Sequence, residues 1–216
     1  MSAARPGHLV ATGLEYRAGG RLVLDGVSLA ARGGEALSVS GPSGSGKTTL
    51  LLTLAGILTP TSGEVTWDGA SVSPGGHPAP GIALVLQTYG LSPVLTAAEN
   101  VALPLQARGL DRAEIRRRCA DTLSRVGLAG VGGRPIGALS GGQQQRVAVA
   151  RALALHAAVL LADEPTSQLD AENRARILDL VAEVVATGAV VILASHDPAV
   201  DAACTHHVRL ADGKTV

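Results

Sequence analysis

The chain alternates short apolar runs with glycine-rich breaks, and this pattern predicts a mixed α/β fold. Over residues 9–39 the apolar runs are separated by Gly19-Gly20 and Gly33-Gly34, as is typical of β-strands joined by turns. The runs at 159–162 and 189–194 are unbroken and largely aliphatic. Such runs suit central strands of a parallel sheet that is covered on both faces.

Helical spacing of apolar residues occurs in four stretches. We expect helices over residues 47–57, 111–126, 141–155 and 171–186. In the second stretch Asp111 can cap the first turn, Gly127 closes the helix, and residues 116–118 form an arginine-rich, solvated face. Its apolar stripe consists of Ile115, Cys119, Leu123 and Val126.

Shorter signals complete the α/β reading. Residues 64–67 followed by Asp68-Gly69 predict a hairpin, residues 73–81 a loop, and the apolar run 82–86 a buried strand. The helix expected at 171–186 separates the two long apolar runs, which gives the β-α-β order of an α/β core.

Composition narrows the class of protein. The chain has 216 residues, of which 46% are hydrophobic, and this excludes a disordered chain and suits one domain. Its 18 basic and 18 acidic residues balance, so a broadly basic surface for nucleic acid is not expected. We expect Cys119 and Cys204 to be buried, reduced thiols, and we expect neither a leader at the N-terminus nor a membrane span.

A phosphate-binding loop is predicted at residues 41–48. The sequence Gly41-Pro42-Ser43-Gly44-Ser45-Gly46-Lys47-Thr48 fits GxxxxGK[ST] between an apolar strand and an amphipathic helix. Its glycines let backbone N–H groups surround an anion, and the helix start adds partial positive charge. Lys47, one of only two lysines in the chain, can reach the β- and γ-phosphates, and the Thr48 hydroxyl can bind Mg²⁺.

Two carboxylates follow the apolar run at 159–162. Asp163 and Glu164 would lie at the carboxyl edge of a parallel sheet, where ligands bind. We expect Asp163 to hold Mg²⁺ and Glu164 to polarise the water that attacks the γ-phosphate.

A second anion site is predicted at the helix that begins near residue 141. Ser140 can cap this helix, and Gly141 and Gly142 leave backbone N–H groups accessible at its start. The surrounding sequence is Leu139-Ser140-Gly141-Gly142-Gln143. With this stretch the chain resembles the ATP-binding cassette (ABC) ATPases over nearly its whole length.

The resemblance assigns roles to residues of this chain. Residues 41–48 match the Walker A loop, 139–143 the LSGGQ signature and 159–163 the Walker B strand, with Glu164 in the place of the catalytic glutamate. Gln87 matches the Q-loop glutamine and His196 the switch histidine. Residues 167–170 match the D-loop, and Tyr16 matches the aromatic that stacks on adenine.

The resemblance thus implies the following site. Catalysis falls to Glu164, His196, Gln87 and Lys47. ATP is bound by Tyr16, Gly41, Pro42, Ser43, Gly44, Ser45, Gly46, Lys47, Thr48, Thr49, Ser140, Gly141, Gly142, Gln143 and Asp170. Mg²⁺ is held by Thr48, Gln87 and Asp163. The implied fold is a RecA-like P-loop core (about 1–88 and 145–216) with a small antiparallel β-subdomain and an inserted helical subdomain (about 89–144).

The resemblance also implies partners. One cassette per chain calls for a second copy or a paralogue, joined head to tail around two ATP molecules. A transporter role calls for a separate membrane permease. This permease would contact the region of the Q-loop and the helical subdomain, and would hold the chain at the cytoplasmic face of the membrane. Residues 91–105 are similar to the lipoprotein-release, macrolide-export and cell-division branch. That branch usually has a longer, basic helical segment before the strand that leads to Gln87. In this chain the segment is reduced to residues 71–81. The alternatives are a soluble cassette ATPase that acts on DNA or ribosomes, and a mechanotransmission ATPase without transport.

Overall fold

The computed structural model describes residues 7–72 and 75–216, and these divide into two compact units. The first unit comprises the chain up to Leu84, residues 158–164 and residues 181–216. The second comprises residues 85–157 and 165–180. No helix among the described residues is long and apolar enough to span a membrane. The leader expectation concerns residues 1–6, which lie outside the described residues.

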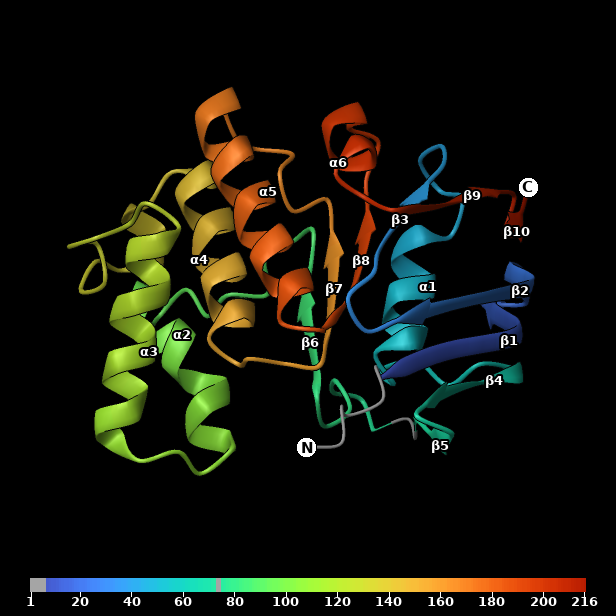
Figure 1. Cartoon of the computed structure of the whole chain (residues 1–216), viewed down its shortest axis with the longest axis horizontal. Coiled ribbons are helices and arrows are strands. Elements are labelled where there is room, and N and C mark those ends of the chain that lie inside the picture. The colour runs from blue at the N-terminus through green and yellow to red at the C-terminus, as the bar shows by residue number, and fades with distance from the viewer. Residues whose placement is uncertain (1–6, 73–74) are drawn as a thin grey trace. The chain divides into compact units, whose positions relative to one another are not determined.

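A six-stranded sheet forms the centre of the first unit (Figure 1). Its order is β10-β9-β3-β8-β7-β6, and β3, β8, β7 and β9 run parallel. The strands are β3 (Ala36–Ser40), β6 (Ile82–Val85), β7 (Val159–Asp163), β8 (Val190–Ala194), β9 (His206–Ala211) and β10 (Lys214–Thr215). Every residue of β7 and β8 is buried, which confirms that the two long apolar runs are central parallel strands.

A four-stranded antiparallel sheet completes the first unit. It has the order β2-β1-β4-β5, with β1 (His8–Ala18), β2 (Arg21–Arg32), β4 (Ser62–Trp67) and β5 (Ala70–Ser71). The hairpin predicted at Asp68-Gly69 is confirmed: both residues have positive φ, 50° and 79°, as a two-residue turn between twisted strands requires.

Helix α1 (Lys47–Leu54) joins the two sheets of the first unit. It contacts β2 of the antiparallel sheet as well as β7 and β8 of the parallel sheet (Figure 1). Leu50 and Leu54 are fully buried and belong to one apolar cluster with residues of both sheets. Because this cluster fixes the first turn of α1, it also fixes the loop that leads into the helix. The unit's second helix, α6 (Pro198–Ala202), follows β8.

The second unit is helical. It contains α2 (Ala97–Ala107), α3 (Arg112–Arg125), a 3₁₀ turn at Ile136–Ala138 and α4 (Gly141–Leu153). Helix α5 (Ala171–Ala186) begins in this unit and ends in the first. The caps predicted for α3 and α4 are present. The Asp111 carboxylate accepts the N–H groups of Ala113 and Glu114, and Ser140 forms a reciprocal capping box with Gln143.

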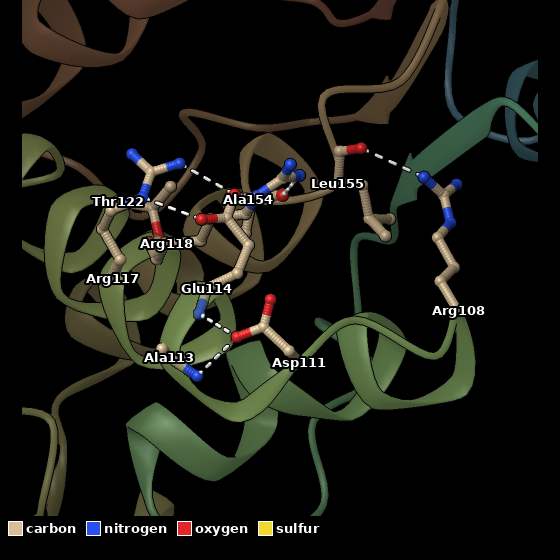
Figure 2. A network of polar contacts seen from close by, with 9 residues as sticks. All are labelled: Arg108, Asp111, Ala113, Glu114, Arg117, Arg118, Thr122, Ala154 and Leu155. Carbon is tan, nitrogen blue, oxygen red and sulfur yellow. Dashed lines mark hydrogen bonds and ion pairs between the residues drawn. The ribbon is translucent and has the colours of Figure 1, made fainter.

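Two arginines close the carboxyl end of α4 (Figure 2). Arg118 on α3 donates to the carbonyl of Ala154, and Arg108, after α2, donates to that of Leu155, both at 3.0 Å. Such contacts satisfy carbonyl groups that a helix end leaves free. Arg118 also pairs with Glu114 and keeps only 21% of its side chain exposed, so the prediction of a wholly solvated arginine face was wrong at this residue.

Other expectations need correction. Helix α1 ends at Leu54 instead of residue 57, because Gly56 takes a positive φ of 73°. Helix α2 was not predicted, since Pro104 within it is a residue that normally interrupts helices. The strands β9 and β10 were not predicted either. The expected loop at 73–81 is irregular from Gly75 onward, while residues 73 and 74 lie outside the described residues.

Candidate functional site

The predicted site residues of the first unit lie at the ends of three neighbouring strands of the parallel sheet. The phosphate loop follows β3, the pair Ser195-His196 follows β8, and Asp163-Glu164 ends and follows β7. Because β3, β8 and β7 are adjacent and parallel, their carboxyl ends meet at one edge of the sheet. Residues separated by more than 100 positions in the sequence therefore share one site.

The glycines of the phosphate loop are required by both backbone angle and space. Gly41, Gly44 and Gly46 have φ values of 146°, 79° and 103°, which side-chain-bearing residues rarely adopt. A Cβ atom on Gly41 would lie 2.2 Å from the carbonyl oxygen of Leu210, and one on Gly46 would lie 2.9 Å from that of Val23. The loop therefore keeps a shape in which successive backbone N–H groups can face an anion. Pro42, Ser43 and Ser45 lie in this loop, and Thr49 lies in the first turn of α1.

Lys47 reaches back across the loop. Its ammonium donates to the carbonyl oxygens of Gly41 at 2.7 Å and Pro42 at 3.1 Å. A rotatable ammonium can exchange such carbonyl partners for phosphate oxygens, which are stronger acceptors. The Lys47 ammonium thus lies against the loop that the sequence predicts to bind phosphate.

Thr48 and Asp163 form the contact that links the loop to the acidic pair. The Thr48 hydroxyl donates to Oδ2 of Asp163 at 2.5 Å. Burial raises the pKa of Asp163, the hydrogen bond from Thr48 opposes this, and the charge of Glu164 raises the pKa further. A buried carboxylate beside a hydroxyl is an oxygen donor set that suits Mg²⁺. Within the described ranges, no three His, Cys, Asp or Glu side chains gather as a metal site.

Glu164 is held in an uncommon backbone conformation. Its φ is +50°, although its side chain has a Cβ, and its N–H donates to the carbonyl of Ala194 at 2.8 Å. Residues held in this region carry strain of about 1–3 kcal/mol and are concentrated at active sites. The residue is only 6% exposed. Because Glu164 directly follows β7, its buried carboxylate lies at the carboxyl edge of the sheet.

Two residues that follow β8 fix the Glu164 carboxylate. Nδ1 of His196 lies 2.7 Å from Oε1, and the Ser195 hydroxyl donates to Oε2 at 3.0 Å. The His196 side chain is otherwise 75% exposed. These contacts bring together two residues, Glu164 and His196, that the resemblance assigns to catalysis. Ser195 was not predicted as a site residue, and its only signal was its place beside His196.

The second unit holds the other predicted anion site. Ser140 caps α4, its hydroxyl accepts the N–H of Gln143 at 3.3 Å, and Gly141 is exposed at the helix start. A Cβ on Gly142 would lie 2.8 Å from the carbonyl oxygen of Gln168. The glycine at 142 thus permits the segment 167–170 to approach α4 closely.

Asp170 caps a helix. Its Oδ1 accepts the N–H of Asn173 at 2.8 Å, and both carboxylate oxygens accept from the Asn173 side chain. The hydrogen bond from the Asn173 backbone is the largest cause of the lowered pKa of Asp170. The sequence predicted a nucleotide ligand here, and the structure adds a capping role at the start of α5.

The remaining predicted residues are placed as follows. Tyr16 lies on β1 in the first unit, where it is half-buried against the apolar cluster. Gln87 is exposed just after β6 and belongs to the second unit. The roles inferred for both from the family resemblance stay predictions.

The second unit also contains a groove of about 840 Å³. It is formed by α2, α3 and the segment 128–133. Its apolar lining includes Ala98, Ala102, Ile115, Cys119, Leu123 and Leu128. Glu99, Arg112 and Arg116 also line it. Apolar walls with a few charged groups are typical of a binding surface for a helix or a small ligand.

Comparisons with known proteins identify relatives of this chain. A family model described as ABC transporter matches residues 24–167. An uncharacterized ABC transporter ATP-binding protein of Mycobacterium tuberculosis is 42% identical over 192 residues, which are 85% of this chain and 58% of that protein. The Fe(3+) ions import ATP-binding protein FbpC of Brucella abortus is 41% identical over 198 residues, 91% of this chain and 56% of FbpC. The chain thus spans somewhat more than half the length of these relatives.

A solved structure gives a fuller match. The ATP-binding cassette MJ0796, in a dimeric post-hydrolysis state bound to ADP and Pi, aligns with a TM-score of 0.88 and 33% identity, and the alignment covers 96% of each chain. A second dimeric structure of MJ0796, described as a bacterial ABC transporter cassette, aligns with a TM-score of 0.87 and 33% identity, again over 96% of each chain.

Proposed function

Because the chain belongs to the ABC transporter family, we propose that it binds and hydrolyses ATP as the motor subunit of a membrane transporter. The observation that carries the proposal is the hydrogen bond from Thr48 to Asp163, at 2.5 Å. It brings the phosphate loop, the Asp163 carboxylate and, one residue later, Glu164 to one edge of the sheet. Phosphoryl transfer needs these parts together.

In this proposal different residues bind different parts of the nucleotide. The N–H groups of residues 41–48 and the ammonium of Lys47 hold the β- and γ-phosphates. Thr48, Asp163 and Gln87 hold Mg²⁺, which neutralises charge on these phosphates when it is bound. Tyr16 stacks on the adenine ring. The parallel carboxyl ends described above support this division of roles.

The chemical step is attack of water on the γ-phosphorus. A bond forms between the water oxygen and the γ-phosphorus, and the bond from this phosphorus to the bridging oxygen of ADP breaks. Glu164 accepts the water proton and later releases it to solvent, so that ADP and phosphate leave. His196 and Ser195 orient Glu164 through the hydrogen bonds at 2.7 and 3.0 Å.

We further propose that two copies act as a head-to-tail pair. The capped start of α4 at Ser140 is a second anion-binding end, separate in the sequence from the phosphate loop. In a head-to-tail pair the start of α4 in one copy, with residues 140–143 and Asp170, closes over ATP held by the loop of the other. The dimers reported for MJ0796 support such a pairing.

The groove of the second unit supports a membrane partner. Its apolar walls could bind the apolar face of a short helix. Arg112 and Arg116, which also line the groove, could pair with an acidic residue next to that face of the helix. We propose that a permease inserts a cytoplasmic helix there, which would hold the chain at the inner face of the membrane. Residues 91–105 favour a permease of the lipoprotein-release, macrolide-export and cell-division kind.

The experiment that tests the proposal has two parts. The purified chain is assayed for phosphate release from ATP, with Lys47→Ala as the variant that loses ATP binding. The Glu164→Gln variant, loaded with ATP, is then used to capture partners from solubilised membranes. Absence of hydrolysis and of ATP binding would overturn the ATPase. Capture of DNA or ribosomes instead of a multi-span membrane protein would favour the soluble alternative.

A further inference from the structure

The amide of Gln145 joins two segments of the second unit. This residue lies on α4, five positions after the cap Ser140, and is only 1% exposed. Its Oε1 accepts the N–H of Gln168 at 2.9 Å, and its Nε2 donates to the Ser167 hydroxyl at 3.3 Å. A buried amide whose two ends both bind one segment fixes that segment in distance and in register.

The close approach of the two segments makes the contact rigid. The carbonyl of Gln168 lies so near Gly142 that a Cβ there would be 2.8 Å from it. Leu169 is buried beside the same glycine, and its N–H donates to the carbonyl of Thr166 at 3.1 Å. Residues 166–169 therefore form a tight turn packed on the first turns of α4.

This turn begins two residues after Glu164. The chain passes from the first compact unit to the second between Glu164 and Pro165. The carboxylate of Glu164 is held by Ser195 and His196 in the first unit, whereas the segment that leaves Glu164 is held by Gln145 in the second. The strained φ of +50° at Glu164 lies between these two anchors.

We propose that Gln145 is a positioning residue for Glu164. By fixing residues 167 and 168 to α4, it sets the path of the chain out of Glu164 and thereby the direction of the carboxylate. This inference rests on the proposed ATPase function, and it assigns a role to a residue outside the motif set predicted from the sequence.

The test compares three variants in steady-state ATP hydrolysis. Gln145→Leu leaves the N–H of Gln168 and the Ser167 hydroxyl without their partner. We expect kcat to fall by about 10- to 100-fold, the size of effect that a misplacement of about 1 Å produces, with KM for ATP unchanged. Gln145→Glu keeps an acceptor for Gln168 and for the rotatable Ser167 hydroxyl, and should restore most of the rate. Val147→Ala, fully buried on the same helix, is the control for lost packing.

The outcomes separate the inference from the function on which it rests. If the unmodified chain hydrolyses ATP and Gln145→Leu does so equally fast, the positioning role is wrong while the ATPase stands. If Gln145→Leu and Val147→Ala lose activity in proportion to their loss of stability, Gln145 only supports the fold. Should Gln145→Leu fail to fold, Ser167→Ala removes one of the two hydrogen bonds at an exposed residue. A normal kcat in Ser167→Ala would then overturn the proposal.

Discussion

Nδ1 of His196, which lies just past the end of β8, is 2.7 Å from the carboxylate of Glu164, which lies just past the end of the neighbouring strand β7. An ionised carboxylate only accepts hydrogen bonds, so it pairs with a His196 ring whose Nδ1 carries a proton. The Ser195 hydroxyl occupies the other oxygen of Glu164. Both oxygens of the Glu164 carboxylate are thus held in place, which is the preorganisation that the proposed general base needs.

We predict that Glu164→Gln removes turnover and keeps ATP binding. The amide retains the shape of the side chain but cannot take a proton from water, so kcat should fall by about 100-fold or more. His196→Ala should also lower kcat, because the carboxylate loses its orienting partner. Phosphate release and binding of a fluorescent ATP analogue measure the two effects. Near-normal turnover in Glu164→Gln would place the general base elsewhere.

Two glycines of the phosphate loop should respond differently to alanine. Gly41→Ala forces a Cβ to within 2.2 Å of the Leu210 carbonyl oxygen, so the loop must move and ATP binding should be lost. Gly44→Ala meets no atom within 4 Å and adds only the strain of its positive φ, about 1–2 kcal/mol. ATP binding and thermal unfolding, measured for both variants, check this. Equal loss of binding in the two would show that space at Gly41 is unimportant.

The thiol of Cys204 should make the fold sensitive to alkaline pH. Burial is the main cause that raises its pKa from 9.0 to about 11, and Asp201 adds to it. Because the folded state favours the protonated thiol, the stabilisation is complete below pH 9 and is lost as the pH rises toward 11. The loss amounts to about 2–3 kcal/mol. Urea unfolding between pH 8 and 11 measures it, and Cys204→Ala should flatten the dependence.

The cap of α3 should contribute measurably to stability. Asp111→Ala removes the acceptor for the N–H groups of Ala113 and Glu114 and should lower the free energy of unfolding by about 1 kcal/mol. Asp121→Ala changes the same charge at an exposed position within α3 and should have a much smaller effect. Chemical denaturation of both variants provides the comparison. Equal losses would mean that charge, and not capping, is responsible.

The charge of the groove should matter for a membrane partner. Replacing Arg112 and Arg116 together by Glu reverses two charges in the groove, so an acidic helix should no longer be captured from membranes. Arg209→Glu changes one exposed charge on β9, in the other unit, and serves as the control. Undiminished capture by the double variant would exclude the groove as the docking surface.

Much of the site follows from local sequence, because each motif carries its own strand, loop and helix start. The order of the strands makes Asp163, His196 and the phosphate loop neighbours, and the apolar runs alone already predicted a parallel sheet. Contacts between side chains are a different matter. Gln145 is one of three consecutive glutamines, and nothing in the neighbouring sequence indicates that it binds Gln168. The capping role of Asp170 likewise depends on the position of Asn173. Such pairs depend on packing, which the pattern of residues does not encode.

The position of Trp67 allows the unfolding of the two compact units to be followed by two different optical signals. It is the chain's single tryptophan, it lies on β4, and it packs against the apolar cluster of the first unit. Its fluorescence therefore reports only on that unit, whereas α2, α3 and α4 of the second unit contribute strongly to the circular dichroism of helices. Transitions that coincide in both signals would mean that the units unfold as one cooperative body. Separate transitions would assign a stability to each unit without cutting the chain.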